Sequence, residues 1–212
     1  MIILDCEQMD LEWWQAHVGT PSASNFSKIL TPTGKSSASA KDYMYQLAGE
    51  ILTGKKTETY HNAVMQRGIE MEAEARTLYE LMFDCEVQQV GLIYPDEQRK
   101  YCCSPDGIIE TPMFPPGGSF YGYGIEIKCP LIHTHVGYLL SGKLPTIYVP
   151  QVQGSMLITG FKRWDFMSYF PGLKPLIVKV ERDDKYCNLL AKELDKFIDE
   201  LVKTIRKLKE AE

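Results

Sequence analysis

The segment that most constrains this chain is the short run 124–130, with the sequence Gly-Ile-Glu-Ile-Lys-Cys-Pro. On a strand, whose side chains alternate between faces, Glu126 and Lys128 point to one side, and Ile125 and Ile127 point to the other. The β-branched residues favour a strand with one buried apolar face. A single strand therefore carries a carboxylate and an amine next to each other on its opposite face.

A second carboxylate precedes this strand in the motif Ser-Pro-Asp-Gly, residues 104–107. Because the preceding segment ends at Gly107, we expect Asp106 to lie near the face that carries Glu126 and Lys128. Clustered carboxylates repel each other and a clustered amine loses hydration, so such a group is costly without a function. A divalent metal resolves the conflict if Asp106 and Glu126 are its oxygen ligands and Lys128 faces a water or a phosphate. This arrangement is the PD-(D/E)xK nuclease pattern.

Composition predicts one globular domain spanning residues 1–212. The chain has 212 residues, of which 44% are hydrophobic and 24% charged, enough to build one sizeable core. No apolar run approaches the roughly 20 residues that span a bilayer. The short acidic N-terminus has no signal-peptide features, so we expect a cytoplasmic protein without membrane attachment.

Charge and cysteine content narrow the chemistry further. The net charge of −5 is only weak evidence against a nucleic-acid partner, because binding depends on where charge sits. Basic residues form a loose population in the first third of the chain, namely Lys28, Lys35, Lys41, Lys55, Lys56 and Arg67. The six cysteines show no CxxC pair, which predicts buried free thiols in a reducing compartment and argues against zinc or iron–sulfur sites.

Hydrophobic periodicity predicts an α/β fold with a mixed central sheet flanked by helices on both sides. The expected helices are a helical pair over 12–30 with a turn at 19–21, then 42–53, 62–83, 149–158 and 184–208. The expected strands are 87–94, 100–104, 124–129, 162–170 and 176–181. Loops are expected at 31–40, around His133 and His135, and at 114–123, where a substrate-contacting flap is the alternative.

Several polar residues are candidates to complete a site. Glu72 lies closest to the apolar stripe of helix 62–83, so its carboxylate could reach the metal face, although an ordinary interface Glu is the alternative. Gln151 and Gln153 open the helix after Pro150, where free N–H donors favour phosphate, and plain capping is equally compatible. Ser22, Ser24 and Ser104 are hydroxyl donors suited to a phosphate or to capping.

Together these fragments resemble the phage lambda exonuclease family, the YqaJ-type viral recombinase nucleases. The resemblance covers about 14–186. Its carriers are Trp14…Gly19…Ser22-Ala-Ser24, Gly68-x3-Glu72-x2-Ala75-Arg76-Thr77-Leu78, Cys103-Ser104-Pro105-Asp106-Gly107, Glu126-x-Lys128-Cys129-Pro130 and Gln151-Val-Gln153-x-Ser155-Met156. Each fragment alone is a weak signal, whereas their order and spacing are specific. The resemblance implies a PD-(D/E)xK, restriction-endonuclease-like core.

The resemblance also implies an activity. Members of this family are Mg²⁺-dependent exonucleases that enter at a double-stranded DNA end and degrade one strand 5′ to 3′. They release mononucleotides, leave 3′ overhangs, and work as ring-shaped trimers. The resemblance further implies a phage recombination system in a bacterial host and a single-strand-annealing partner protein. Two Mg²⁺ per site are expected, with Mn²⁺ as a substitute.

Roles carry over residue by residue. Asp106, Glu126 and the backbone carbonyl of Ile127 would bind metal, and Glu72 would join the second metal or its water. Lys128 would activate the attacking water and Gln151 would orient it. The 5′ phosphate would meet Ser24 and Ser104, with Ser22 and Gln153 as further DNA contacts.

One position departs from the family pattern, which usually has an arginine where this chain has His17. With an ordinary pKa of about 6.5, His17 would be mostly neutral at pH 8. It would then give a weaker and pH-dependent grip on the 5′ phosphate, with Lys35 or Lys28 supplying part of the lost charge. The alternative is that His17 is a helix-surface residue and the pocket relies on the serines.

Two other functions remain open from the sequence. A restriction-like endonuclease would share the core, although no added recognition domain is visible. A non-catalytic DNA-end-binding recombination protein is the second alternative, and the intact Asp106, Glu126 and Lys128 argue against it.

Overall fold

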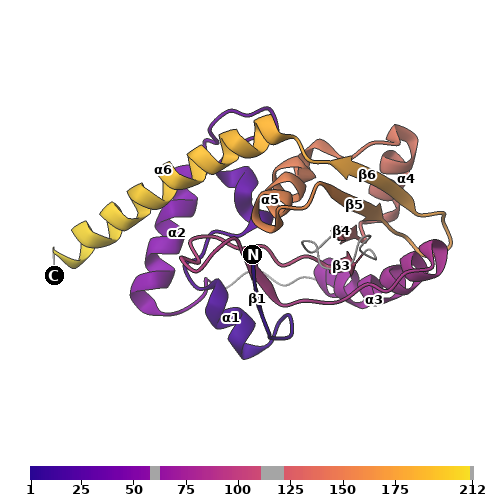
Figure 1. Ribbon diagram of the computed structural model, residues 1–212, viewed down its shortest axis with the longest axis horizontal. Coiled ribbons are helices and arrows are strands. Elements are labelled where there is room, and N and C mark those ends of the chain that lie inside the picture. The colour runs from indigo at the N-terminus through magenta and orange to yellow at the C-terminus, as the bar shows by residue number, and fades with distance from the viewer. Residues whose placement is uncertain (58–62, 111–121, 211–212) are drawn as a thin grey trace, which may run out of the picture.

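A computed structural model describes residues 1–57, 63–110 and 122–210 of the chain (Figure 1). Its helices are α1 (Leu11–His17), the 3₁₀ helix η1 (Ala23–Lys28), α2 (Ala40–Thr53), α3 (Ala63–Phe83), α4 (Ile132–Ser141), the 3₁₀ helix η2 (Thr146–Tyr148), α5 (Val149–Thr159) and α6 (Asp184–Lys209). Its strands are β1 (Ile2–Leu4), β2 (Leu92–Tyr94), β3 (Gly107–Glu110), β4 (Gly122–Lys128), β5 (Arg163–Ser168) and β6 (Leu176–Glu181).

The central sheet is mixed, as predicted, with the strand order β3-β4-β5-β6. β4 and β5 run parallel and place Glu126 beside Phe166, whereas the two outer pairs are antiparallel. A separate antiparallel pair joins β1 to β2. The parallel central pair requires a crossover, and the chain from α4 to α5 supplies it between β4 and β5.

Helices cover both faces of this sheet (Figure 1). On one face, Ala75 and Tyr79 of α3 pack with Ile125 and Ile127 of β4. On the other face, α5 packs in the larger core that includes Trp164 of β5, with η1, α2 and α6 behind it. The predicted alternation of β4 is therefore confirmed, because its isoleucines enter the α3 core and leave Glu126 facing α5.

The long helix α6 closes the fold by lying along α2 and α5 (Figure 1). Asp183 caps its N-terminus by accepting a hydrogen bond from the Tyr186 N–H at 2.9 Å. The predicted apolar stripe is buried from Leu190 to Leu201, whereas Leu208 is exposed. The last part of the stripe is not buried, because α6 extends beyond the rest of the molecule toward the C-terminus (Figure 1).

Three local predictions in the N-terminal half were wrong in detail. The second helix of the expected 12–30 pair is the short 3₁₀ helix η1, which follows Ser22. The expected strands 87–94 and 100–104 shrink to β2 and isolated bridges, among them Ile93 with Cys103 and Ser22 with Cys102. The strand β1 was missed, because three residues are too few to show a periodicity.

The loop expected around His133 and His135 is instead the start of α4. His135 is fully buried, with Nδ1 2.8 Å from the Ser168 Oγ and Nε2 3.1 Å from the Lys174 carbonyl oxygen. Of these two histidines, His133 is the exposed one. The sequence misled because His135 gains its two partners from β5 and the chain beyond it, which no local pattern reveals.

The remaining sequence expectations have mixed outcomes. All six cysteines are free thiols, as predicted, but only Cys102, Cys103 and Cys187 are buried, and the other three are partly exposed. The proposed loop or flap at 114–123 falls almost entirely outside the described residues. Within the described part of the chain, no helix has the length and apolar character needed to cross a membrane.

Glycine at position 154 of α5 sets how closely this helix approaches η1. A Cβ at Gly154 would lie 2.4 Å from the Phe26 ring, which is itself fully buried. We expect Gly154→Ala to lower the free energy of unfolding by about 1–3 kcal/mol, because a packed core resists the added methyl group.

Gly137 in α4 is the matched control, because a Cβ there meets nothing within 4 Å. Gly137→Ala should leave stability unchanged or raise it by up to about 1 kcal/mol through helix propensity. Denaturant unfolding of both variants measures the difference, and equal losses in the two would contradict the packing argument.

Candidate active site

The acidic centre begins on β4, where Glu126 is almost completely buried, with 1% of its surface exposed. Its Oε1 accepts a hydrogen bond from the Gln151 Nε2 at 2.6 Å and forms an ion pair with the Lys128 ammonium. Gln151 comes from the first turns of α5, so the packing of α5 on the sheet brings this donor to the carboxylate. The structure thus brings together three of the residues singled out in the sequence.

Asp106 joins this group from the residue just before β3. Its Oδ2 accepts a hydrogen bond from the Ile127 N–H at 2.5 Å. The antiparallel register, in which Gly107 lies opposite Ile125, produces this approach. A side chain at position 107 is excluded, because a Cβ would lie 2.1 Å from the Val87 Cγ1.

Glu72 reaches the same centre from α3. Its Oε1 accepts a hydrogen bond from the Arg76 Nη2 at 2.6 Å, one helical turn away. The Arg76 Nε also donates to the Asp106 carbonyl oxygen at 3.2 Å. Arg76 therefore ties the α3 carboxylate to the backbone that carries Asp106, a link that helix position alone did not indicate.

The electrostatics of these groups reflect crowded negative charge in a buried place. Burial raises the pKa of Glu126 to about 8, with the charges of Asp106 and Glu72 adding to the effect. Burial and the charge of Asp106 raise the pKa of Glu72 to about 7. Burial alone would lower the pKa of Lys128, but the Glu126 and Asp106 carboxylates raise it above its usual value.

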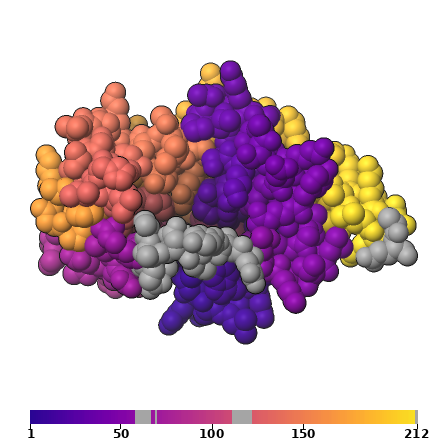
Figure 2. Space-filling view, turned by 180° about the vertical axis from the view of Figure 1, so that it is seen from behind, coloured from indigo at the N-terminus to yellow at the C-terminus, as the bar shows by residue number. Residues whose placement is uncertain are grey.

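All these residues line one cavity of about 720 Å³. Figure 2 shows this face of the molecule, where the surface recedes between the α4 region on one side and the N-terminal elements on the other. Glu72, Asp106, Glu126, Ile127, Lys128 and Gln151 form one part of the described lining. Four elements or their ends, α3, β3, β4 and α5, therefore meet at this cavity.

A second group of predicted residues lines the same cavity from the N-terminal side. It comprises His17, Ser22, Ser24 and Ser104. The Ser22 and Ser24 hydroxyls lie 3.0 Å apart, and the Ser104 Oγ donates to the Gly91 carbonyl oxygen at 2.8 Å. The hydroxyl donors expected for a phosphate thus lie in the cavity that holds the acids.

His17 is not a helix-surface residue, so that alternative is wrong. It is buried at the end of α1, and its Nδ1 lies 2.9 Å from the Trp13 carbonyl oxygen. Burial, with a smaller contribution from the positive charge of Lys56, lowers its pKa to about 4. The ordinary pKa assumed from the sequence was therefore wrong for the DNA-free protein.

Three predicted residues do not join the cavity. Gln153 points to the other side of α5, where its Nε2 donates to the Glu181 carbonyl oxygen at 2.9 Å and its Oε1 accepts from the Asp183 N–H at 2.9 Å. It ties α5 to the start of α6, so the prediction of a DNA contact is corrected. Lys35 is exposed in the loop after η1, and neither it nor Lys28 belongs to the described lining.

Sequence reasoning gave no site role to several polar residues of the lining, among them Asn25 and Lys56. The Asn25 Nδ2 donates to the Ser22 Oγ at 3.2 Å. Lys56 follows α2 in sequence and was visible only as one of several basic residues. Nothing in its local pattern distinguished it from Lys55, because its place depends on how α1 packs beside α2.

The carboxylates of this centre suit a hard divalent cation, although here they accept hydrogen bonds from protein groups. Among the described residues, no three Asp, Glu, His or Cys side chains already form a ligand set. Asp106 and Glu126 instead accept hydrogen bonds from Ile127, Lys128 and Gln151. Carboxylate oxygens are the ligands that Mg²⁺ prefers, and the raised pKa of Glu126 indicates excess negative charge that a cation would compensate.

Comparisons with known proteins agree with this geometry. The model of the YqaJ-like viral recombinase domain matches residues 12–162. Two structures of the alkaline exonuclease LHK-Exo from Laribacter hongkongensis, one in complex with dAMP, are each 32% identical in sequence. In both, the match covers 95% of this chain and 97% of LHK-Exo, with a TM-score of 0.82.

A phage-related exonuclease from Haemophilus somnus 129PT shares the fold, at 18% identity and a TM-score of 0.64. That match covers 88% of this chain and 96% of the other. No curated protein sequence matches the chain.

The mixed sheet and the acidic cavity define a nuclease fold of the lambda exonuclease type. The chain belongs to the family of YqaJ-like viral recombinases.

The lowered pKa of His17 predicts a specific loss of stability in acid. Because its folded pKa of about 4 lies below the unfolded value of about 6.5, the unfolded state binds more protons between these values. This contribution is intact above pH 6.5 and is lost as the pH falls toward 4, up to about 3 kcal/mol. We expect His17→Gln to lose less stability than the wild type over this range.

Denaturant unfolding of the DNA-free protein at several pH values measures this effect. His133→Gln is the control, because His133 lies exposed on α4 and should keep the wild-type slope. The same slope in the wild type and His17→Gln would show that His17 is not held neutral by burial.

Proposed function

We propose that this chain is a Mg²⁺-dependent exonuclease that enters at a double-stranded DNA end and degrades one strand 5′ to 3′. It would release mononucleotides and leave 3′ single-stranded overhangs for phage-type recombination. One observation carries the proposal. Asp106 before β3, Glu126 and Lys128 of β4 and Gln151 of α5 meet at one cavity, which continues to a wall of hydroxyl groups. The dAMP bound by LHK-Exo, a mononucleotide, fits the expected product.

In this proposal Asp106, Glu126, the Ile127 carbonyl and Glu72 hold two Mg²⁺ ions, with Mn²⁺ as a substitute. When bound, the metal lowers the pKa of the attacking water and neutralises the leaving oxygen. Gln151, fixed at 2.6 Å from Glu126, orients the carboxylate and the water. With both carboxylates serving as ligands, the cation would offset the charges that raise the pKa of Lys128, and its Nζ would then be able to share the proton of the water.

We further propose the setting of this activity. The chain acts as one exonuclease domain in the cytoplasm of a bacterial host, encoded by a phage or prophage. It assembles as a ring-shaped homotrimer, which would offset its net charge of −5 by surrounding one duplex with several local basic surfaces. A single-strand-annealing recombination protein receives the overhang.

The DNA substrate separates this proposal from its alternatives. With Mg²⁺ present, we expect mononucleotides from linear duplexes and no cutting of closed circles, because the site needs an end. A 5′ label should appear early as mononucleotide, and a 3′ label should stay in long fragments. Gel analysis of labelled products measures both.

Nicked or linearised circles would instead indicate a restriction-like endonuclease. Binding of linear duplex without any product would indicate a non-catalytic end-binding protein.

The metal centre gives a second test. Asp106→Ala and Lys128→Ala should each reduce cleavage by at least about 100-fold, because one removes a ligand and the other the proton-sharing amine. Only Asp106→Ala should weaken Mg²⁺ binding, since Lys128 is no ligand. Initial rates and calorimetric titration with Mg²⁺ measure the two effects separately.

The control is Lys162→Ala, an exposed lysine in the turn before β5. Near-normal turnover in Lys128→Ala would show that Lys128 has no part in the mechanism. Unchanged Mg²⁺ affinity in Asp106→Ala would show that Asp106 is not a metal ligand.

A further inference from the structure

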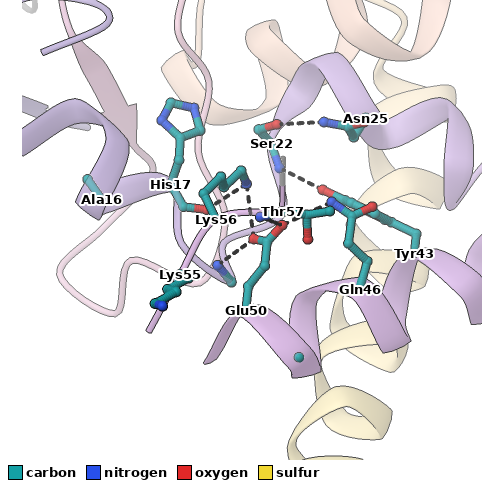
Figure 3. A network of polar contacts seen from close by, with 12 residues as sticks. Ala16, His17, Ser22, Asn25, Tyr43, Gln46, Glu50, Lys55, Lys56 and Thr57 are labelled. Atoms are coloured by element: carbon teal, nitrogen blue, oxygen red, sulfur yellow. Dashed lines mark hydrogen bonds and ion pairs between the residues drawn. The ribbon is translucent and has the colours of Figure 1, made fainter. Parts of the chain in front are cut away.

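Another buried carboxylate, Glu50 of α2, is hydrogen-bonded to Lys56, which lines the cavity (Figure 3). Only 2% of its surface is exposed. It accepts hydrogen bonds from the Gln46 Nε2 at 3.0 Å, the Gly19 N–H at 3.0 Å, the Lys56 Nζ at 3.1 Å and the Thr57 N–H at 3.2 Å. Burial would raise its pKa, but these donors together lower it below the usual value, so Glu50 stays charged. Glu50 is therefore a fixed anchor that joins α2, the turn after α1 and the segment after α2.

Lys56 is the cationic member of this network that reaches the cavity. Its Nζ also donates to the His17 carbonyl oxygen at 3.0 Å, and a quarter of its side chain is exposed. Among the described residues, these two contacts use two of the three N–H donors of the ammonium. Glu50 is satisfied by three uncharged donors as well, so the positive charge of Lys56 is only partly compensated at the cavity wall.

His17, directly beside Lys56, cannot supply this charge itself (Figure 3). The Trp13 carbonyl oxygen can only accept, so the His17 Nδ1 at 2.9 Å from it carries the proton. In a neutral ring the Nε2 then has only a lone pair, which repels a phosphate oxygen. His17 shapes the wall, whereas the hydrogen bonds that suit an anion come from Lys56, Asn25 and the serines.

We propose that Lys56 is the residue that recognises the phosphate at the DNA end, and that Glu50 is the positioning residue that holds its ammonium in place. This inference rests on the proposed action at DNA ends. It names the cation that determines specificity for a 5′-phosphoryl over a 5′-hydroxyl terminus. Lys28 and Lys35, expected from the sequence to share this charge, are replaced by Lys56, because Lys28 stacks over the Tyr43 ring at 4.9 Å and Lys35 is outside the lining.

End binding without turnover tests the proposal. Fluorescence anisotropy is measured with a hairpin duplex carrying one 5′-phosphoryl or one 5′-hydroxyl end, in EDTA so that no strand is cut. The wild type should prefer the phosphoryl end. Lys56→Ala should lose about tenfold or more in affinity for that end and little for the hydroxyl end, as expected for loss of a charged hydrogen bond. The slope of log affinity against log salt concentration should fall by about one, as expected for the loss of one phosphate contact.

Matched variants separate recognition from folding. Lys55→Ala is the control, since Lys55 is exposed and directed away from Glu50 in Figure 3, and it should keep the wild-type preference. Lys56→Arg should retain most of the preference, whereas Lys56→Gln, which keeps the length of the stem, should lose it. Glu50→Gln should lower the preference by raising KM for phosphoryl ends more than KM for hydroxyl ends.

A preference for phosphoryl ends that survives in Lys56→Ala or Lys56→Gln, with wild-type thermal melting, would overturn the inference. So would the absence of any such preference in the wild type. Failure of the wild type to digest linear DNA would overturn the proposed exonuclease, and the end-binding measurement would still decide the role of Lys56.

Discussion

The burial of the Glu126 carboxylate is the constraint on which the rest of the site depends. A buried charge is stable only when it is paired and hydrogen-bonded, and here the donors come from β4 itself and from α5. Lys128 lies next to Glu126 because alternate residues of a strand share a face. Gln151 reaches Glu126 only because α5 packs on the same face of the sheet. The close approach of α5 to η1 at Gly154 keeps η1, with Ser22 and Ser24, next to the helix that carries Gln151.

The two ends of the cavity use the same physical device. At each end a nearly buried glutamate holds a lysine whose ammonium lies at the cavity wall, Glu126 with Lys128 and Glu50 with Lys56. The outcomes differ because their neighbours differ. Burial, with the charges of Asp106 and Glu72, raises the pKa of Glu126, whereas the uncharged donors around Glu50 and the charge of Lys56 together outweigh burial and lower its pKa. One end therefore suits a cation and the other an anion, which is the polarity that a phosphodiester next to metal ions requires.

The sequence predicted the parts of the site that follow from local periodicity. The faces of β4, the role of Gly107 as a break and the entry of Glu72 beside the core all depend on residues close in sequence. It failed where a side chain finds its partners across the fold. His135 was assigned to a loop although Ser168 and Lys174 bury it, and Gln153 was assigned to DNA although it binds the chain before α6. Such contacts leave no periodic signal.

The pairing of His17 with Lys56 illustrates why a departure from a family pattern need not be a loss. The resemblance leads one to expect an arginine at position 17, which would remain charged at any working pH. Here Lys56 donates to the backbone oxygen of that same residue, so an arginine would place two cations beside the single buried carboxylate of Glu50. A histidine avoids this repulsion, because burial and Lys56 together keep its ring neutral. In this chain the positive charge at this wall of the cavity is carried by Lys56 in the segment after α2, and the buried Glu50 carboxylate holds it there.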